Sequence, residues 1–389
     1  MFCYQCEQTV GGKGCTRQGV CGKVPEVAAL QDVLLHSVKG LSQYASRARD
    51  LGVTDEGMNA CSIKALFATV TNVNFDPESL EAMIRCVCGF KEKAAGLYEQ
   101  AAAGAGKTVE KLSGPSGFEP AADQAGLVSQ GGALGLEARS SERGEETVAL
   151  EELVTYGIKG LAAYAVHAMI LGQTDDAVFG FVHRALARIA EGAAAEELVG
   201  LAFEAGEVNI RAMELLDAGN TRAYGHPEPT EVRVTPVTGK AILVSGHDLR
   251  DLEELLKQTE GKGINVYTHG EMLPANAYPG LKKYRHLVGN YGTAWQNQRK
   301  EFEAFPGAIL MTTNCIQKPK ESYSARIFTS GIVGWPGTTH VRNHEFGPVI
   351  EAALAAPGFA EDAPEKKIVI GFGRNAVLGA ADKVIEAVK

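Results

Sequence analysis

The sequence lacks the features that would direct it to a membrane or to nucleic acid. Its first six residues, MFCYQC, contain no basic segment followed by an apolar run, so no secretory signal peptide is predicted. The longest apolar stretch, residues 157–172, is interrupted by Lys159 and His167 and is too short and polar to span a bilayer. A formal net charge of −9 offers no basic field to phosphates. We therefore expect a cytoplasmic protein with neither a membrane nor a nucleic-acid partner.

What the chain does contain is a globular composition with an unusual use of cysteine. Its 389 residues exceed one ordinary core and predict several domains, and 45% hydrophobic with 22% charged residues is typical of soluble proteins. In a reducing compartment, clustered cysteines indicate metal binding or redox chemistry rather than disulfides. There are eight cysteines: Cys3, Cys6, Cys15, Cys21, Cys61, Cys86, Cys88 and Cys315.

Residues 25–222 have a helical pattern that contains an internal repeat. Apolar residues recur at three- and four-residue steps from Ala28 to Leu51, which predicts one apolar helix face. Residues 30–55 align without gaps with residues 150–175, sharing a Lys-Gly-Leu-x-x-Tyr-Ala string. This indicates two similar helical bundles. Residues 107–144 are rich in Gly, Ser, Glu and Pro, and we interpret them mainly as a connection.

Beyond the linker signature at residues 226–229, short β-rich runs alternate with helical patterns. That rhythm is typical of a parallel α/β sheet. The predicted fold is therefore multidomain, with repeated helical bundles followed by a Rossmann-like parallel α/β domain. The predicted strands are 241–245, 264–268, 286–288, 308–312, 327–329 and 367–370.

The N-terminal cysteines have the spacing of a metal site. They follow the pattern Cys3-x2-Cys6-x8-Cys15-x5-Cys21, and five glycines in residues 11–22 allow the chain to wrap tightly and direct N–H groups at sulfur. Four thiolates suit a cubane iron–sulfur cluster. Structural zinc is the rival, although zinc ribbons usually present two short knuckles and the second pair here is spread apart.

The cysteines between the two candidate sites have a simpler interpretation. Cys86 and Cys88 lie in a predicted helix with side chains about 200° apart, so they do not easily share one site. Core packing or helix surface is the ordinary role for such residues. Cys61 is assigned to the core.

Three further potential ligands follow predicted strands. His247 follows the first strand, Glu271 the second, and Cys315 a later one. Because ligands collect at the carboxyl ends of parallel strands, an imidazole, a carboxylate and a thiolate are expected to converge there, a set suited to iron or zinc. His269 competes with His247, and the sequence pattern does not separate them.

These motifs together resemble the hybrid-cluster protein family (hydroxylamine reductase, prismane protein), and the cysteine spacing is similar to the branch found in anaerobes. The resemblance covers the whole chain. It includes the opening MFCYQC with its cysteine spacing, GHD at 246–248, THGE at 268–271, TNC at 313–315 and GWPG at 334–337.

The resemblance implies two cofactors and a reaction. A [4Fe–4S] cluster and a hybrid [4Fe–2O–2S] cluster would be present, and hydroxylamine would be reduced to ammonia and water with electrons from an unidentified donor. Nitric oxide is an alternative substrate. The implied ligands are Cys3, Cys6, Cys15 and Cys21 for the first cluster, and His247, Glu271 and Cys315 for the second.

The resemblance also implies that this chain is shorter than other members of the family. Family members continue past Lys389, and three further cysteines and a glutamate there would complete the hybrid cluster, so the 389-residue chain alone is expected to be inactive. The implied domains are a cysteine-rich segment (1–24), two helical bundles (25–222), an α/β domain (223–365) and the beginning of another (366–389).

Three other functions fit parts of the sequence. A cubane-only electron carrier would use only the N-terminal cysteines, and a carbon monoxide dehydrogenase relative would contain nickel. A dinucleotide-binding oxidoreductase would use the Gly-x-Gly-x-x-Ala turn at residues 371–376, which alone is a weak match.

Overall fold

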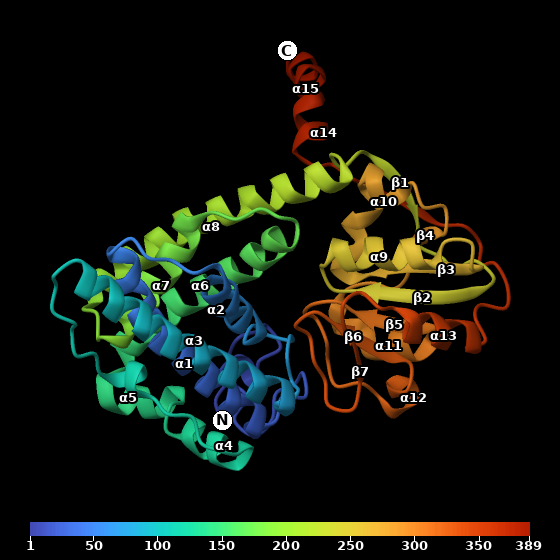
Figure 1. The fold of residues 1–389 in the computed structure, drawn as a ribbon. Helices are drawn as coiled ribbons and strands as arrows, with labels where there is room; N and C mark the ends of the chain where they lie inside the picture. Colours follow the sequence, from blue (N-terminus) through green and yellow to red (C-terminus); the bar gives the residue numbers. More distant parts are fainter. The chain divides into compact units, whose positions relative to one another are not determined.

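The computed structural model describes residues 1–389, and the chain divides into two compact units, Met1–Leu216 and Asp217–Lys389. Figure 1 shows a helical first unit and a second unit built on a sheet. The division falls inside the long helix α8 (Ala195–Tyr224). Helices followed by a parallel α/β sheet confirm the predicted fold class.

The first unit contains the repeat as two sets of three helices. Helices α1 and α6 each have 26 residues, and their bounds differ by a shift of 120 at both ends. Helices α2 and α7 begin at the same shift, each with an aspartate cap that accepts a backbone N–H bond. The bounds are α1 Pro25–Asp50, α2 Glu56–Ala68, α3 Pro77–Gly104, α6 Glu145–Ile170 and α7 Asp176–Ala190, followed by α8.

The core of the first unit forms around α1. Pro25 occupies the first turn, where a missing N–H costs nothing, and the apolar face is fully buried at Leu30, Leu34 and Leu41. Helix α1 packs on α3 and α7.

Residues 107–144 are more ordered than predicted. They contain the 3₁₀ turn η2 (Gly114–Gly117) and the helices α4 (Gln124–Gly132) and α5 (Leu136–Arg143). The segment does connect α3 to α6, as interpreted, but it also contains helices that its composition did not predict. Asp123 caps α4 by accepting from Gly126 N, and Gly131 lets α4 approach the α1 backbone, since a Cβ there would lie 2.3 Å from the Ala29 oxygen. Composition alone does not distinguish a glycine that lets two helices pack closely from a glycine in a loop, so the helices were not predicted.

The second unit is built on a six-stranded sheet of order β4-β3-β2-β5-β6-β7, in which every pairing is parallel. The predicted strands from residue 241 to 329 all exist, within two residues at each end. The strands are β2 Lys240–Ser245, β3 Ile264–His269, β4 Leu287–Asn290, β5 Ala308–Met311, β6 Ile327–Ser330 and β7 Thr339–Val341, and the α-helices are α9 Leu249–Thr259, α10 Pro279–Lys282, α11 Gln298–Ala304, α12 Glu321–Ser324 and α13 Gly347–Ala355.

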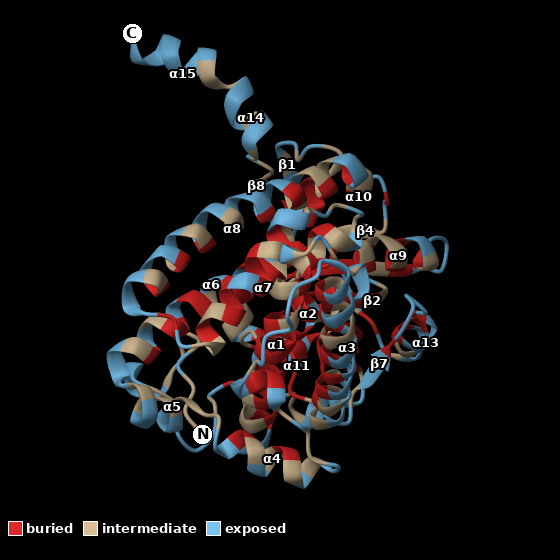
Figure 2. Ribbon diagram, turned by 60° about the vertical axis from the view of Figure 1, so that its left-hand side comes forward, coloured by how far each residue is buried: buried red, intermediate tan, exposed pale blue.

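A separate ribbon completes the second unit. Strands β1 (Thr230–Arg233) and β8 (Lys367–Ile370) pair antiparallel, and β1 was not foreseen. The glycine turn at residues 371–376 thus follows a strand whose partner in this structure is the antiparallel β1. Helices α14 (Arg374–Gly379) and α15 (Ala381–Val388) follow it and are largely exposed (Figure 2). That residues 366–389 begin a further α/β domain stays a prediction.

Helix α6 is long and apolar enough by composition to cross a membrane, but half of that window is buried inside the structure. A core helix of a folded domain passes the same test, and α6 occupies that position.

Candidate metal centres

The N-terminal segment folds back on itself so that two cysteines meet. Cys3 and Cys15 form an antiparallel bridge, with Cys3 N donating to Cys15 O at 3.1 Å and Cys15 N donating to Cys3 O at 2.8 Å. The return is made by the turn η1 (Val10–Gly12), in which Gly11 and Gly12 have positive φ. The spacing of eight residues between the second and third cysteines therefore encodes a hairpin-like loop.

Cys21 joins the same cluster of thiols. Burial raises the pKa of the Cys21 thiol, and Cys3 and Cys6 lie close enough to raise it further. A Cβ at Gly19 would lie 2.9 Å from the Cys21 sulfur, so this glycine allows the backbone to approach that sulfur. Cysteines brought near one another along glycine-rich turns suit an iron–sulfur cluster, since backbone close to sulfur is how such clusters are cradled.

A buried lysine accompanies these thiols. Lys23 is 3% exposed, its Nζ lies 4.0 Å from the Cys3 sulfur, and it donates to Gln31 Oε1 at 2.6 Å. Gln31 is fixed in turn by donating to Asn74 O. Lys23 was not among the predicted site residues, although its position two residues after Cys21 was a visible signal.

The second candidate site lies where the order in which strands are added to the sheet reverses. From β2 the chain proceeds outward to β3 and β4, then returns to β5 on the other side of β2. The carboxyl ends of the two strands flanking such a switch point form a crevice in which ligands bind. His247 lies two residues after β2, Glu271 two residues after β3, and Cys315 four residues after β5. Three adjacent strands therefore deliver the three side chains to one edge.

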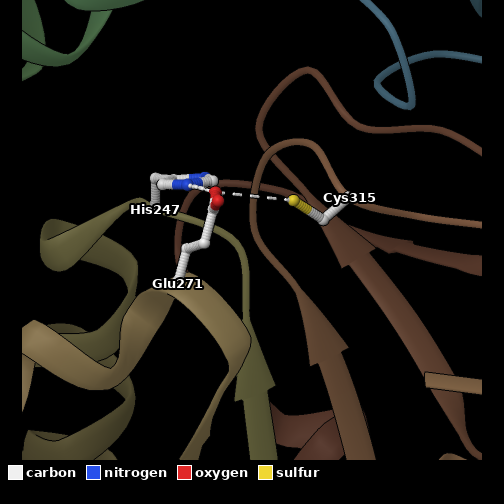
Figure 3. Close-up of side chains that lie close together, drawn as sticks. All are labelled: His247, Glu271 and Cys315. Carbon is white, nitrogen blue, oxygen red and sulfur yellow. Dashed lines mark hydrogen bonds and ion pairs between the residues drawn. The ribbon is translucent and has the colours of Figure 1, made fainter. Parts of the chain in front are cut away.

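Figure 3 shows the three side chains meeting above the strand ends. His247 Nε2 lies 2.6 Å from Glu271 Oε2, and the Cys315 sulfur lies 3.9 Å from the same oxygen. One ligand atom from each residue lies within 4.8 Å of the other two. This arrangement of nitrogen, oxygen and sulfur donors is compact enough to contact one metal centre.

Burial and hydrogen bonding set the charge of this group. The hydrogen bond from His247 lowers the pKa of Glu271, so the carboxylate is ionised at neutral pH. Burial, with the Glu271 carboxylate adding to it, raises the pKa of Cys315 to about 12. The thiol is therefore protonated until a cation displaces its proton, as metal binding to thiols requires.

The loops that present these residues are fixed by Thr313. Its Oγ1 accepts from His247 N at 2.9 Å and lies 3.3 Å from His247 Nδ1, which orients the ring and leaves Nε2 toward Glu271. Gly246 has φ of +109°, and a Cβ there would lie 2.5 Å from Thr312 Oγ1, so the two loops touch. The sequence analysis quoted Thr313 only within a motif and assigned it no role.

Cys315 has a strained backbone. Its φ of +71° lies in the left-handed region that a residue with a side chain rarely adopts. Gln298 donates a hydrogen bond to Cys315 O and holds the conformation. Strain of this kind gathers at functional sites, where the surroundings fix a side chain in a required direction.

The structure separates the two candidate histidines. His269 is fully buried, with Nδ1 3.1 Å from Ser245 Oγ and Nε2 2.9 Å from Glu301 Oε2. Its two ring nitrogens are occupied by Ser245 on β2 and Glu301 on α11, whereas His247 faces Glu271 and Cys315.

A cysteine-rich segment and a mixed nitrogen, oxygen and sulfur group at a sheet switch point are residue sets typical of redox metalloproteins. A scan of protein-family models matches residues 1–389 to the Prismane/CO dehydrogenase family. The chain belongs to this family and is an iron–sulfur oxidoreductase.

Curated relatives show the same relationship. The chain is 56% identical over 390 residues to a protein named hydroxylamine reductase from Syntrophobacter fumaroxidans, and 55% identical to one of that name from Methanocella arvoryzae. Each alignment covers 100% of this chain and 71% of the relative. Among solved structures, a carbon monoxide dehydrogenase from Thermococcus sp. AM4 matches with 16% identity and a TM-score of 0.40, covering 98% of this chain and 59% of that one.

Proposed function

We propose that this chain carries the N-terminal cluster site and part of the catalytic site of a hydroxylamine reductase. The observation that carries the proposal is the group formed by His247, Glu271 and Cys315 at the sheet switch point. The relatives above, at 55–56% identity, have the name of that activity. Because the chain spans 71% of their length, the complete activity belongs to the proposal.

The N-terminal cysteines are proposed to hold a [4Fe–4S] cluster. The backbone bridge between Cys3 and Cys15, and the electrostatic effect of Cys3 and Cys6 on Cys21, support this proposal. Zinc would accept the same four thiolates, but the family is one of iron–sulfur oxidoreductases. A cluster held by these cysteines would supply electron transfer from an external donor.

The second group is proposed to hold part of a hybrid iron–sulfur–oxygen cluster, which when bound supplies Lewis-acid binding of hydroxylamine and electrons for cleaving its N–O bond. The overall reaction takes up two electrons and two protons and yields ammonia and water. His247 is oriented by Thr313, so its Nε2 is the atom offered to iron. Glu271 offers a partly exposed carboxylate, and Cys315 loses its proton on binding. A cytoplasmic location is proposed with this function, because all eight cysteines are free.

The test is cluster content and turnover in the protein as the cell makes it, purified without oxygen. Iron and acid-labile sulfide are counted per chain, EPR spectra are recorded, and hydroxylamine reduction is followed with reduced methyl viologen as electron source. His247→Ala is expected to abolish turnover and one of two cluster signals. The matched control His226→Ala, at an exposed histidine of the same unit, is expected to retain both. Zinc in place of iron, or full turnover in His247→Ala, would refute the proposal.

A further inference from the structure

Two cysteines outside both metal sites lie against each other on the surface of the first unit. Cys61 on α2 and Cys86 on α3 have their sulfur atoms 3.5 Å apart. The sequence analysis assigned Cys61 to the core, which was wrong: it is partly exposed, and Cys86 is exposed. Sequence spacing could not reveal the pair, because the packing of two helices brings together residues 25 positions apart.

The pair lies in an open groove between α2 and α3 of about 280 Å³. Its lining is mainly apolar, including Met83, Val87 and Phe90, and Lys64 is its one charged residue. A small molecule can therefore reach the sulfurs, and the positive charge of Lys64 favours a small molecule that is anionic.

The two thiols differ in their surroundings. Cys86 is solvent-exposed. Burial and the neighbouring Cys86 thiol raise the pKa of Cys61 well above its usual value, so Cys61 stays protonated at neutral pH. Since the thiolate is the nucleophile, the exposed Cys86 reacts first and the less accessible Cys61 follows.

We propose that Cys61 and Cys86 form a redox-active dithiol that is oxidised to a disulfide by low-molecular-weight disulfides. A disulfide bond is about 2.05 Å long, so the two sulfurs, now 3.5 Å apart, must approach by about 1.5 Å to form it. The site shares no residue with the cysteines of the N-terminal cluster or with the group at His247.

The chemistry balances in two steps. The Cys86 thiolate attacks one sulfur of the small disulfide, forming a mixed disulfide and releasing one thiolate. Cys61 then loses its proton and attacks the Cys86 sulfur, forming the protein disulfide and releasing the second thiol. The dithiol gives up two electrons and two protons, and the small disulfide is reduced to two thiols.

Cys88 supplies a matched control on the same helix. It is buried, 6% exposed, and its sulfur lies 3.8 Å from Ser37 Oγ. Trypsin cleavage after arginine and lysine places Cys61 in the peptide 50–64, and both Cys86 and Cys88 in the peptide 86–91. The variants Cys61→Ser, Cys86→Ser and Cys88→Ser therefore decide which sulfur reacts.

The experiment treats the oxygen-free, cluster-loaded protein with oxidised glutathione, blocks remaining thiols, and maps tryptic peptides by mass spectrometry. Wild type and Cys88→Ser are expected to yield the linked peptides 50–64 and 86–91 without bound glutathione. Cys61→Ser is expected to stop at glutathione on Cys86, and Cys86→Ser to react at least tenfold more slowly. Cluster absorbance serves as the folding control for every variant.

Three results would overturn the proposal. The first is that the wild-type reaction stops at the glutathione adduct of Cys86, because Cys61 then does not displace the glutathione. The second is that the Cys86→Ser variant reacts with oxidised glutathione as fast as the wild type. The third is a soft metal ion that copurifies with the pair and is lost in both Ser variants, which would make the groove a metal site.

Discussion

A buried positive charge lies beside the N-terminal thiols. Lys23 is almost fully buried, and its closest oxygen partner belongs to the neutral amide of Gln31. Its Nζ lies 4.0 Å from the Cys3 sulfur, so its charge acts on the cysteines as well as on the Asp32 carboxylate. A positive charge near a cluster stabilises the reduced form, which carries one more electron, more than the oxidised form. Lys23 is therefore expected to raise the reduction potential of the proposed cluster.

Replacing Lys23 tests that expectation. Lys23→Met keeps the length of the side chain and removes its charge, and it should lower the reduction potential by on the order of 50 mV. Lys23→Arg should restore most of the shift. The measurement is an EPR-monitored redox titration. Lys13→Met, an exposed lysine in the same segment, is the control and should not move the potential. Equal potentials in Lys23→Met and wild type would contradict the role.

His183 makes the first unit sensitive to acid. It is fully buried on α7, with Nε2 3.1 Å from Ser62 Oγ, and burial lowers its pKa to about 3. In the unfolded chain its pKa is about 6.5, so between these values the unfolded state binds the extra proton. Stability from this residue is therefore present above pH ~6.5 and is lost progressively as pH falls toward 3.

The expected slope is up to ~1.36 kcal/mol of unfolding free energy per pH unit between pH 6 and pH 4. Urea unfolding followed by circular dichroism at several pH values measures it. His183→Gln should flatten the dependence, whereas His226→Gln, at an exposed histidine, should leave it unchanged. An unaltered slope in His183→Gln would assign the acid sensitivity to other groups.

At the scale of the element, α1 and α6 have matching sequences but different surroundings. Gly40 on α1 is buried, and a Cβ there would lie 2.2 Å from the Pro115 oxygen, because η2 packs directly on the helix. Its repeat mate Gly160 on α6 is exposed, with nothing within 4 Å of the same position. The glycine is therefore needed in one copy of the repeat and tolerated in the other.

Alanine substitution should have opposite effects in the two copies. Gly40→Ala forces backbone apart and should lower the unfolding free energy by about 1–3 kcal/mol. Gly160→Ala should raise it by about 0.5–1 kcal/mol, because alanine favours the helix interior. Urea titration of both variants measures the difference. A similar change of the same sign in both would show that η2 does not press on α1.

The elements themselves were largely predictable from sequence. Buried parallel strands appear as apolar runs bounded by turn residues, which identified five strands of the sheet. The convergence of His247, Glu271 and Cys315 could be expected because strand ends share an edge. Strand β7, Thr339–Val341, was missed since only one of its three residues is buried. A strand that short and exposed has no apolar alternation.

Choices that depend on packing could not be made from sequence. Whether His247 or His269 faces the site depends on Ser245 and Glu301 occupying both nitrogens of His269. The meeting of Cys61 with Cys86 depends on the relative positions of two helices. The local sequence pattern predicts on which side of its own helix or strand a side chain lies. It does not predict which residue from a distant part of the sequence lies opposite that side chain.

At the scale of the whole molecule, each proposed metal site is contained in one compact unit. The N-terminal cysteines and Lys23 belong to Met1–Leu216, and the group at His247 belongs to Asp217–Lys389. Each site is also fixed by its own unit, through α1 and Asn74 in the first and through Thr313 and Gln298 in the second. Occupancy of one site therefore does not require any ligand of the other.

This separation predicts additive loss of iron. Cys3→Ser with Cys6→Ser should remove the signal of the N-terminal cluster and leave the second signal unchanged, whereas Glu271→Gln with Cys315→Ser should do the reverse. The combined variant should lose both amounts of iron, because sites without shared partners behave independently. Iron counts and EPR spectra of the three proteins measure this. If removing the N-terminal thiols also emptied the second site, loading of one cluster would depend on the other, and the units would not be independent in assembly.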